Sequence, residues 1–229
     1  MRTIGLLGGM SWESTAHYYR VINEAVRERV GGLHSAEVVL HSVDFAPIAE
    51  LQARDAWAET AVILGSAARA LASAGAEFLV IATNTMHIVA DEIEAAAGIP
   101  LLHIADPTAD AIRASGVGTV GLLGTRFTME KDFYLRRLEQ RGIHAIVPDA
   151  ADRDTVHRII YDELVMGVVR DESREQYRGV MQRLVDRGAE GIIAGCTEIT
   201  MLVGPADISV PMFDTTELHA LGAVERALG

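Results

Sequence analysis

The only cysteine of the chain, Cys196, follows an apolar run that ends in Gly195. A similar segment lies 113 residues earlier, and there Thr83 takes the position equivalent to Cys196. One of these equivalent loops offers a thiol and the other a hydroxyl, so both loops could contribute to one site. We therefore predict a site built from two related halves, with Cys196 in one and Thr83 in the other.

Cys196 also has a simpler interpretation, because a lone cysteine is often only a small buried apolar residue. It lies, however, at the end of a predicted strand and beside a predicted helix start, whose N–H groups would lower the pKa of the thiol and favour the thiolate.

A single cysteine excludes a zinc site with several thiolates, and we predict no metal site. His17 and His87 near the same loops either orient a ligand or are structural. A Cys–His–Asp hydrolase is conceivable, but nothing in the sequence identifies a histidine partner.

Four loops rich in glycine, threonine and serine follow predicted strands, at residues 8–11, 83–85, 124–128 and 196–198. Each enters a predicted helix, where unpaired backbone N–H groups can hold a carboxylate. The Gly8-Gly9 pair could equally serve close packing of a strand against a helix, and Asn84 and Thr85 could cap the next helix. The nucleotide-binding motifs G-x-G-x-x-G and G-x-x-x-x-G-K-[ST] are absent.

The elements that must position these loops alternate between short apolar runs and longer amphipathic stretches. This alternation predicts an α/β fold with parallel sheets that helices cover on both faces. The predicted strands are 3–7, 37–42, 78–82, 101–104, 119–123, 144–147, 191–194 and 210–213. The predicted helices are 14–30, 57–74, 86–97, 129–140, 152–166, 174–187 and 216–228.

An internal repeat organises these elements. The sequence of residues 3–8 returns at 119–124, and the Thr83 and Cys196 loops match with nearly the same offset. The period is too long for a solenoid, so it indicates a duplicated α/β lobe. We predict a first lobe of residues 1–100 and 214–229 and a second of 101–213, with the active site in the cleft between two pseudo-symmetric lobes.

The composition excludes several classes of partner. The formal net charge of -12 argues against nucleic acid as a partner and against binding to an anionic membrane. No apolar run reaches the roughly 18 residues that span a bilayer. The chain opens on a strand pattern rather than a signal peptide, and a single cysteine suits a reducing compartment. We expect a soluble, cytoplasmic protein.

The loops resemble the aspartate/glutamate racemase family, which comprises amino-acid racemases that work without pyridoxal phosphate. The family signature Cys-Asn-Thr-x-His corresponds to residues 83–87, and Gly-Cys-Thr-Glu corresponds to residues 195–198. Residues 5–15 and 42–45 are also similar to the family, and the likeness runs from residue 3 to about 217. The resemblance implies an isomerase with two pseudo-symmetric lobes, no cofactor, an amino-acid substrate and a homodimeric assembly.

The resemblance also implies a mechanism and a substrate-binding set. In the family, one thiolate removes the α-proton and a second thiol protonates the opposite face. Here Thr83 replaces the first cysteine, and a hydroxyl is a far poorer base than a thiol. Because the thiol of the second lobe works on the L-face, we expect Cys196 to deprotonate an L-amino acid and Thr83 to reprotonate it, with a bias from L to D. The implied substrate-binding residues are Met10, Ser11, Gln52, Asn84, Thr85, Thr125, Thr128, Thr197 and Glu198.

Two further departures concern the substrate side chain. Where aspartate-specific members carry an arginine, this chain has Gln52, with Arg54 nearby, and Met166 takes the position of a lysine. Loss of two cations weakens binding of an acidic side chain, unless Arg126 compensates. The combination is most similar to the branch with broad or L-aspartate/glutamate specificity, so we expect aspartate and glutamate as substrates.

Two other functions remain open at this point. Decarboxylases of the same fold use one cysteine to protonate a carbanion from one face, which also suits a single thiol. A non-catalytic amino-acid-binding protein would bind the ligand without exchanging its α-hydrogen.

Overall fold

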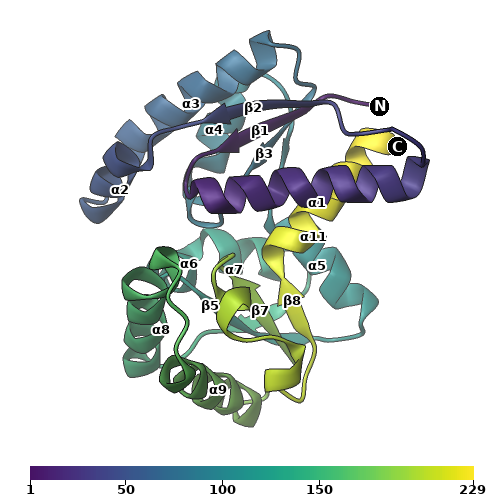
Figure 1. The fold of residues 1–229 in the computed structure, drawn as a ribbon. Coiled ribbons are helices and arrows are strands. Elements are labelled where there is room, and N and C mark those ends of the chain that lie inside the picture. The colour runs from purple at the N-terminus through teal and green to yellow at the C-terminus, as the bar shows by residue number, and fades with distance from the viewer. The chain divides into compact units, whose positions relative to one another are not determined.

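The computed structural model describes residues 1–229, and its strands form two four-stranded parallel sheets (Figure 1). The first sheet has the order β2-β1-β3-β4 and the second has the order β6-β5-β7-β8. The strands of the first are β1 (Ile4–Gly8), β2 (Val38–Ser42), β3 (Phe78–Ile81) and β4 (Leu101–Leu102). Those of the second are β5 (Thr119–Gly124), β6 (His144–Ile146), β7 (Gly191–Gly195) and β8 (Met212–Asp214). The predicted α/β class with two related parallel sheets is confirmed.

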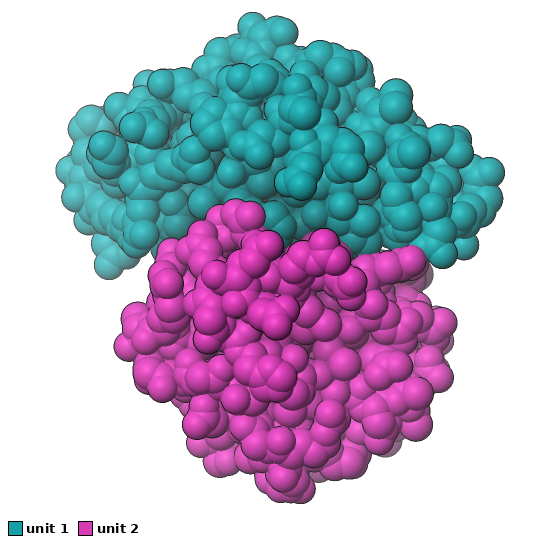
Figure 2. Space-filling view, turned by 180° about the vertical axis from the view of Figure 1, so that it is seen from behind, with its two compact units in different colours: residues 1–104, 219–229 teal, residues 105–218 magenta.

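The chain divides into two compact units (Figure 2). Each unit contains one of the two sheets. Unit 1 comprises Met1–Ile104 and His219–Gly229, and unit 2 comprises Ala105–Leu218. The chain leaves unit 1 after Ile104 and returns to it within helix α11 (Thr215–Leu228). Helix α5 (Ala105–Ala114) thus begins at the first crossing, and α11 contains the second.

In unit 1, helices cover both faces of the sheet, as parallel strands require. One apolar cluster joins Leu6 and Val80 to α1 (Trp12–Val30) and to the end of α11. A second joins Leu7 and Ile81 to the helices of the opposite face. Adjacent residues of β1 thus point to opposite cores, in keeping with the period of a strand. The helices of the second face are α2 (Phe45–Ala53), α3 (Trp57–Ser73), the 3₁₀ helix η1 (Thr85–Val89) and α4 (Ala90–Ala97).

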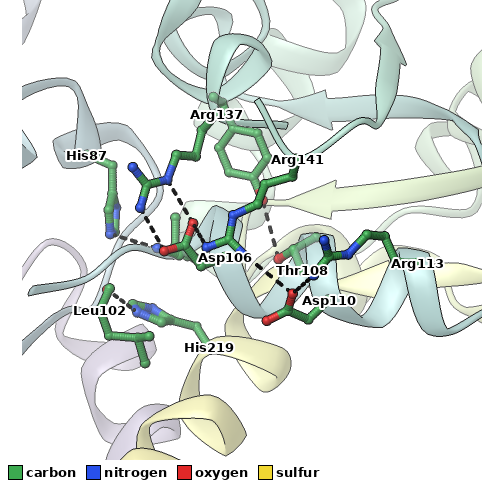
Figure 3. A network of polar contacts seen from close by, with 11 residues as sticks. His87, Leu102, Asp106, Thr108, Asp110, Arg113, Arg137, Arg141 and His219 are labelled. Atoms are coloured by element: carbon green, nitrogen blue, oxygen red, sulfur yellow. Dashed lines mark hydrogen bonds and ion pairs between the residues drawn. The ribbon is translucent and has the colours of Figure 1, made fainter. Parts of the chain in front are cut away.

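Unit 2 has its own core, in which Ile192 and Ala194 of β7 pack with apolar residues of the surrounding helices. Asp106 joins α5 (Ala105–Ala114) to α7 (Asp132–Glu139). Its carboxylate accepts hydrogen bonds from Arg137 at 2.7 and 2.8 Å and pairs with Arg141, just after α7, at 2.9 Å (Figure 3). The helices of unit 2 are α5 (Ala105–Ala114), α6 (Arg126–Glu130), α7 (Asp132–Glu139), α8 (Ala150–Asp162), η2 (Leu164–Met166), α9 (Asp171–Asp186), α10 (Ile199–Leu202) and η3 (Pro205–Asp207).

Several helices differ from the prediction. The sequence did not predict α2 and α5, and each carries a proline as its third residue, Pro47 and Pro107. The stretch predicted as one helix over 129–140 is two helices that meet at Lys131, whose backbone is extended. The helix predicted over 152–166 ends at Asp162 and continues as η2. No helix combines the length and the apolar character needed to cross a membrane.

Candidate active site

In unit 2, the loops of Thr125 and Cys196 leave neighbouring strands at the same edge of the sheet. Gly124 of β5 and Gly195 of β7 are partners in the ladder, so the two loops begin side by side. A Cβ on Gly195 would lie 2.6 Å from the carbonyl oxygen of Leu123. Glycine is therefore required at Gly195 for the strands to approach this closely just before Cys196.

The Cys196 thiol donates a hydrogen bond to Glu198, with Sγ 2.9 Å from Oε2. Burial, the charge of Glu198 and this hydrogen bond raise the pKa of the thiol well above its ordinary value, and the backbone N–H groups of Glu198 and Thr197 act in the opposite direction. The lowered pKa that the sequence predicted is therefore wrong for the free protein. The helix after Cys196, α10, has only four residues, and the residue at its N-cap is Glu198 itself. The carboxylate at this position raises the pKa of the thiol more than the N-terminus of so short a helix lowers it.

Hydroxyl groups surround the same edge of unit 2. Thr125 caps α6, since its side chain accepts a hydrogen bond from the backbone N–H of Thr128, and the two hydroxyl oxygens lie 3.2 Å apart. The hydroxyl of Thr197 lies 3.1 Å from that of Thr216, which follows the neighbouring strand β8. Sequence reasoning missed Thr216, although the repeat of the segment before it pointed to this strand end.

An aromatic pair on α8 lies near Cys196 and was also missed. Burial and the charges of Cys196 and Glu198 raise the pKa of Tyr161 to about 12. The centroid of its ring lies 4.6 Å from that of His157, one helical turn earlier, and the two rings are tilted by 49°. Burial and then the charge of Arg126 lower the pKa of His157. The four-residue spacing of His157 and Tyr161 on one helix face is the signal that could have identified the pair.

In unit 1, the loop of Thr83 follows β3 and is held by His87. The Nδ1 atom of His87 lies 2.9 Å from the carbonyl oxygen of Thr83, and the N–H of Ile104 donates to Nε2 at 3.2 Å. These partners fix a neutral ring with its proton on Nδ1. Burial, His103 and His219 lower the pKa of His87 well below its ordinary value. His87 is therefore a structural residue of this loop.

His219 completes the support beneath this loop. Its Nε2 lies 2.8 Å from the carbonyl oxygen of Leu102 (Figure 3). The hydroxyl of Tyr18 lies 2.9 Å from its Nδ1. The ring centroid of His87 lies 4.6 Å from that of His103 and 5.7 Å from that of His219. Three histidines thus pack together in unit 1, and two of them, His103 and His219, lie next to the points where the chain crosses between units.

The other predicted residues of unit 1 lie around the loops that follow β1 and β3 or on α2. Ser11 caps α1 by accepting a hydrogen bond from the backbone N–H of Ser14, and Met10 packs in the apolar core. Asn84 and Thr85 are buried, Thr85 is the first residue of η1, and Asn84 at its N-cap makes no capping bond through its side chain. Gln52 is buried, with its amide nitrogen 4.0 Å from the sulfur of Met86. Because β1 and β3 pair in parallel, the loops of Ser11 and Thr83 lie at the same sheet edge.

The Gly8-Gly9 pair of unit 1 has a packing role. The N–H of Gly9 donates to the hydroxyl of Thr15 at 2.8 Å, and a Cβ on Gly8 would lie 2.3 Å from a methyl carbon of the same side chain. The backbone of Gly9 has a φ of 94°, which favours glycine. The glycines thus serve the close contact between strand and helix that the sequence left as one of two interpretations.

The cations considered for an acidic substrate side chain are already engaged or missing. The Arg126 guanidinium pairs with Asp154 at 2.7 Å, and Arg54 is exposed with its Nε donating to the carbonyl oxygen of Glu50. Met166 in η2 is 73% exposed and brings no charge. No group of three or more histidine, cysteine, aspartate or glutamate side chains is arranged to hold a metal ion.

Comparisons with known proteins agree on one family. Residues 7–223 match the Asp/Glu/hydantoin racemase family. A crystal structure of a candidate Asp/Glu racemase from Yersinia pestis is 55% identical, with a TM-score of 0.95 and complete coverage of both chains. An aspartate racemase homologue from Pyrococcus horikoshii OT3 is 35% identical over the whole of both chains, with a TM-score of 0.87. The broad specificity amino-acid racemase RacX of Bacillus subtilis (strain 168) is 22% identical over 98% of each chain.

Proposed function

The chain belongs to the Asp/Glu/hydantoin racemase family, and we propose that it racemises an amino acid with Cys196 as the base and Thr83 as the acid. The observation that carries this proposal is the equivalence of the two loops. Both follow the third strand of a 2-1-3-4 sheet, β3 in unit 1 and β7 in unit 2, and one offers a hydroxyl where the other offers a thiol.

The proposed reaction begins with an L-amino acid. The Cys196 thiolate removes the α-proton and becomes a thiol, and the bond electrons pass into the substrate carboxylate as an enediolate-like anion. The Thr83 hydroxyl then donates its proton to the opposite face of Cα, which yields the D-amino acid. The resting enzyme carries Thr83 as a hydroxyl, which is a far poorer base than a thiolate, so we propose that the initial rate at saturating substrate is higher from the L- than from the D-enantiomer.

Each unit has hydroxyl or amide side chains at the sheet edge where its proposed catalytic residue lies. In unit 2, the hydroxyls of Thr125, Thr128 and Thr197 gather at the edge where Cys196 begins. In unit 1, the loop of Met10 and Ser11 lies at the same sheet edge as the loop of Thr83, Asn84 and Thr85, and Gln52 contacts Met86. We propose that these groups hold the carboxylate and stabilise the negative charge that develops on it, which is the role of an oxyanion hole.

For the substrate side chain we propose aspartate and glutamate, bound loosely. Gln52 and the exposed Met166 bring no positive charge, and Arg126 is paired with Asp154. A carboxylate side chain held without a dedicated cation loses most of the charge-assisted binding that an arginine provides. Other L-amino acids should therefore compete, in line with the broad specificity of the Bacillus subtilis relative.

The direct test is incubation of the protein with each L-amino acid in deuterium oxide, followed by chiral analysis. The expected result is a D-product that carries deuterium at Cα, with L-aspartate and L-glutamate among the substrates. Carbon dioxide release from a substituted malonate, without exchange of amino acids, would instead identify a decarboxylase. Binding without exchange would identify an amino-acid-binding protein. A homodimer, expected from the family, is tested by light scattering on the same preparation.

A further inference from the structure

The proposed base must be a thiolate, but the free protein holds Cys196 as a thiol. Its proton points at the carboxylate of Glu198, and Sγ and Oε2 are 2.9 Å apart. The two residues are separated by only Thr197, so the turn itself fixes the pair. Glu198 is therefore the group in position to receive this proton. That it does so during catalysis is an inference that rests on the proposed function.

The surroundings of the pair permit one negative charge but disfavour two. Tyr161 of α8 and Tyr177 of α9 face the pair, and burial together with the charges of Cys196 and Glu198 raises the pKa of each phenol. Glu163 lies near Tyr177 and accepts a hydrogen bond from Ser173 at 2.6 Å. The cations that approach these groups, Arg158 and Arg170, pair with Glu163 at 3.3 and 4.0 Å. Loss of the thiol proton to water would put a second anion beside Glu198, which a buried site resists.

We propose that Cys196 and Glu198 form a one-proton pair, in which Glu198 accepts the thiol proton in the substrate complex and so generates the thiolate. The total charge of the pair then stays at one negative throughout. The backbone N–H groups of Thr197 and Glu198 favour the thiolate form, so the loop stabilises the charge on the sulfur once the carboxyl is neutral. Glu198 thus acts through Cys196 as a positioning residue for a proton, rather than as a contact to the substrate.

The protons balance over one turnover. The Cys196 proton moves to Glu198, and the thiolate takes the substrate α-proton and becomes a thiol again. Thr83 donates its proton to the opposite face and is left as an alkoxide. After product leaves, Glu198 releases its proton to water and Thr83 takes one from water, which restores the starting state.

Alkylation of Cys196 by iodoacetamide tests the pair without using racemase activity. The rate of mass increase is followed from pH 6 to 10 for the wild type, for Glu198→Gln and for Glu172→Gln, which removes an equal charge from an exposed position of α9. In E198Q the thiolate should form at lower pH, so alkylation at pH 7.5 should be about tenfold faster or more. E172Q should match the wild type. Unchanged alkylation in E198Q would overturn the proposal.

Solvent exchange at Cα then tests whether Glu198 takes the proton during turnover. The wild type should exchange L-substrate at a rate that is flat from about pH 6.5 to 8.5, because the proton moves within the pair. In E198Q the proton must pass to solvent, so exchange should rise with pH below the new pKa of the thiol. Parallel profiles for the two proteins would contradict the proposal.

Folding of the variant and the function itself are controlled separately. Glu198→Asp keeps a carboxylate, so it should alkylate with a pH dependence closer to the wild type than to E198Q, whereas a general disturbance of the loop would affect both variants alike and overturn the proposal. Absence of exchange in the wild type would refute the proposed function, while the alkylation result would still report on the pair.

Discussion

The loops of Thr83 and Cys196 occupy equivalent strand ends, yet they treat protons differently. Around Thr83, the partner is a neutral histidine, His87, whose Nδ1 lies 2.9 Å from the backbone carbonyl oxygen of Thr83. Around Cys196, the partner is a carboxylate that holds the thiol proton itself. In the proposed mechanism, the Cys196 half therefore passes a proton between a thiol and a carboxylate, while the Thr83 half donates one from its hydroxyl. On this proposal, duplication of the fold was followed by a division between base and acid.

The largest effect should come from removing the thiol. Cys196→Ala leaves no group that can take the α-proton, so we expect exchange at Cα to fall by about 1,000-fold or more. Exchange is measured by NMR in deuterium oxide with L-aspartate and L-glutamate. The variant should retain its folded thermal transition. Residual exchange within about tenfold of the wild type would mean that Cys196 is not the base.

Removing the hydroxyl should separate the two half-reactions. Thr83→Val keeps the shape of the side chain but loses the acid, so formation of D-product should fall by about 100-fold, while Cys196 still exchanges the α-hydrogen of the L-substrate. Chiral chromatography and NMR on one sample measure both. Thr83→Cys is the matched control, because two thiols should make D-substrate reactive as well. Equal loss of exchange and of product in Thr83→Val would contradict separate roles.

His87, which holds the Thr83 loop, should make the stability of unit 1 depend on pH. Burial lowers the pKa of His87, so below about pH 6.5 the unfolded chain binds more protons than the folded protein. The contribution of the neutral His87 to the free energy of unfolding is therefore fully present above about pH 6.5. It falls by about 1.4 kcal/mol per pH unit as the pH drops towards the folded-state pKa.

His87→Asn keeps a donor for the Thr83 carbonyl but cannot titrate. Urea unfolding between pH 5 and 8 should therefore show a smaller loss of stability in acid for His87→Asn than for the wild type. The corresponding change at the exposed His144 is the control and should leave the slope unaltered. An unchanged slope in His87→Asn would show that His87 is not held neutral by its surroundings.

The smallest effect concerns specificity. Met166→Lys adds a cation at the exposed position where related enzymes for acidic substrates were expected to have one. We expect kcat/KM for L-aspartate relative to a neutral L-amino acid to rise by about tenfold. Competition assays with both substrates measure this ratio. A ratio that does not change would mean that η2 does not approach the substrate side chain.

The sequence predicted all eight strands, because buried parallel strands read as short apolar runs between glycines. It did not predict α2 and α5, since a proline in the third position resembles a helix breaker. Proline is tolerated in the first turn of a helix, where its missing N–H would have no partner in any case. The break at Lys131 carried no such signal, because it depends on how α6 and α7 pack.

The candidate site was predictable in position more than in chemistry. The repeat identified the strand ends that carry Thr83 and Cys196, since equivalent loops keep their spacing along the chain. The direction of the Cys196 pKa shift was not predictable from spacing, because it depends on the Glu198 side chain turning back towards the sulfur. The nearness of Thr216 to Thr197 and of Tyr161 to Cys196 likewise depends on how separate elements pack together.

Exchange in deuterium oxide from each enantiomer of one substrate tests the central claim most directly. With Cys196 as a base on the L-face and Thr83 as a weak acid on the other, L-aspartate or L-glutamate should exchange its α-hydrogen and yield deuterated D-product. The D-enantiomer should exchange at least about tenfold more slowly under the same conditions. Equal initial rates of exchange from the L- and D-enantiomers would contradict a site divided into a strong base and a weak acid.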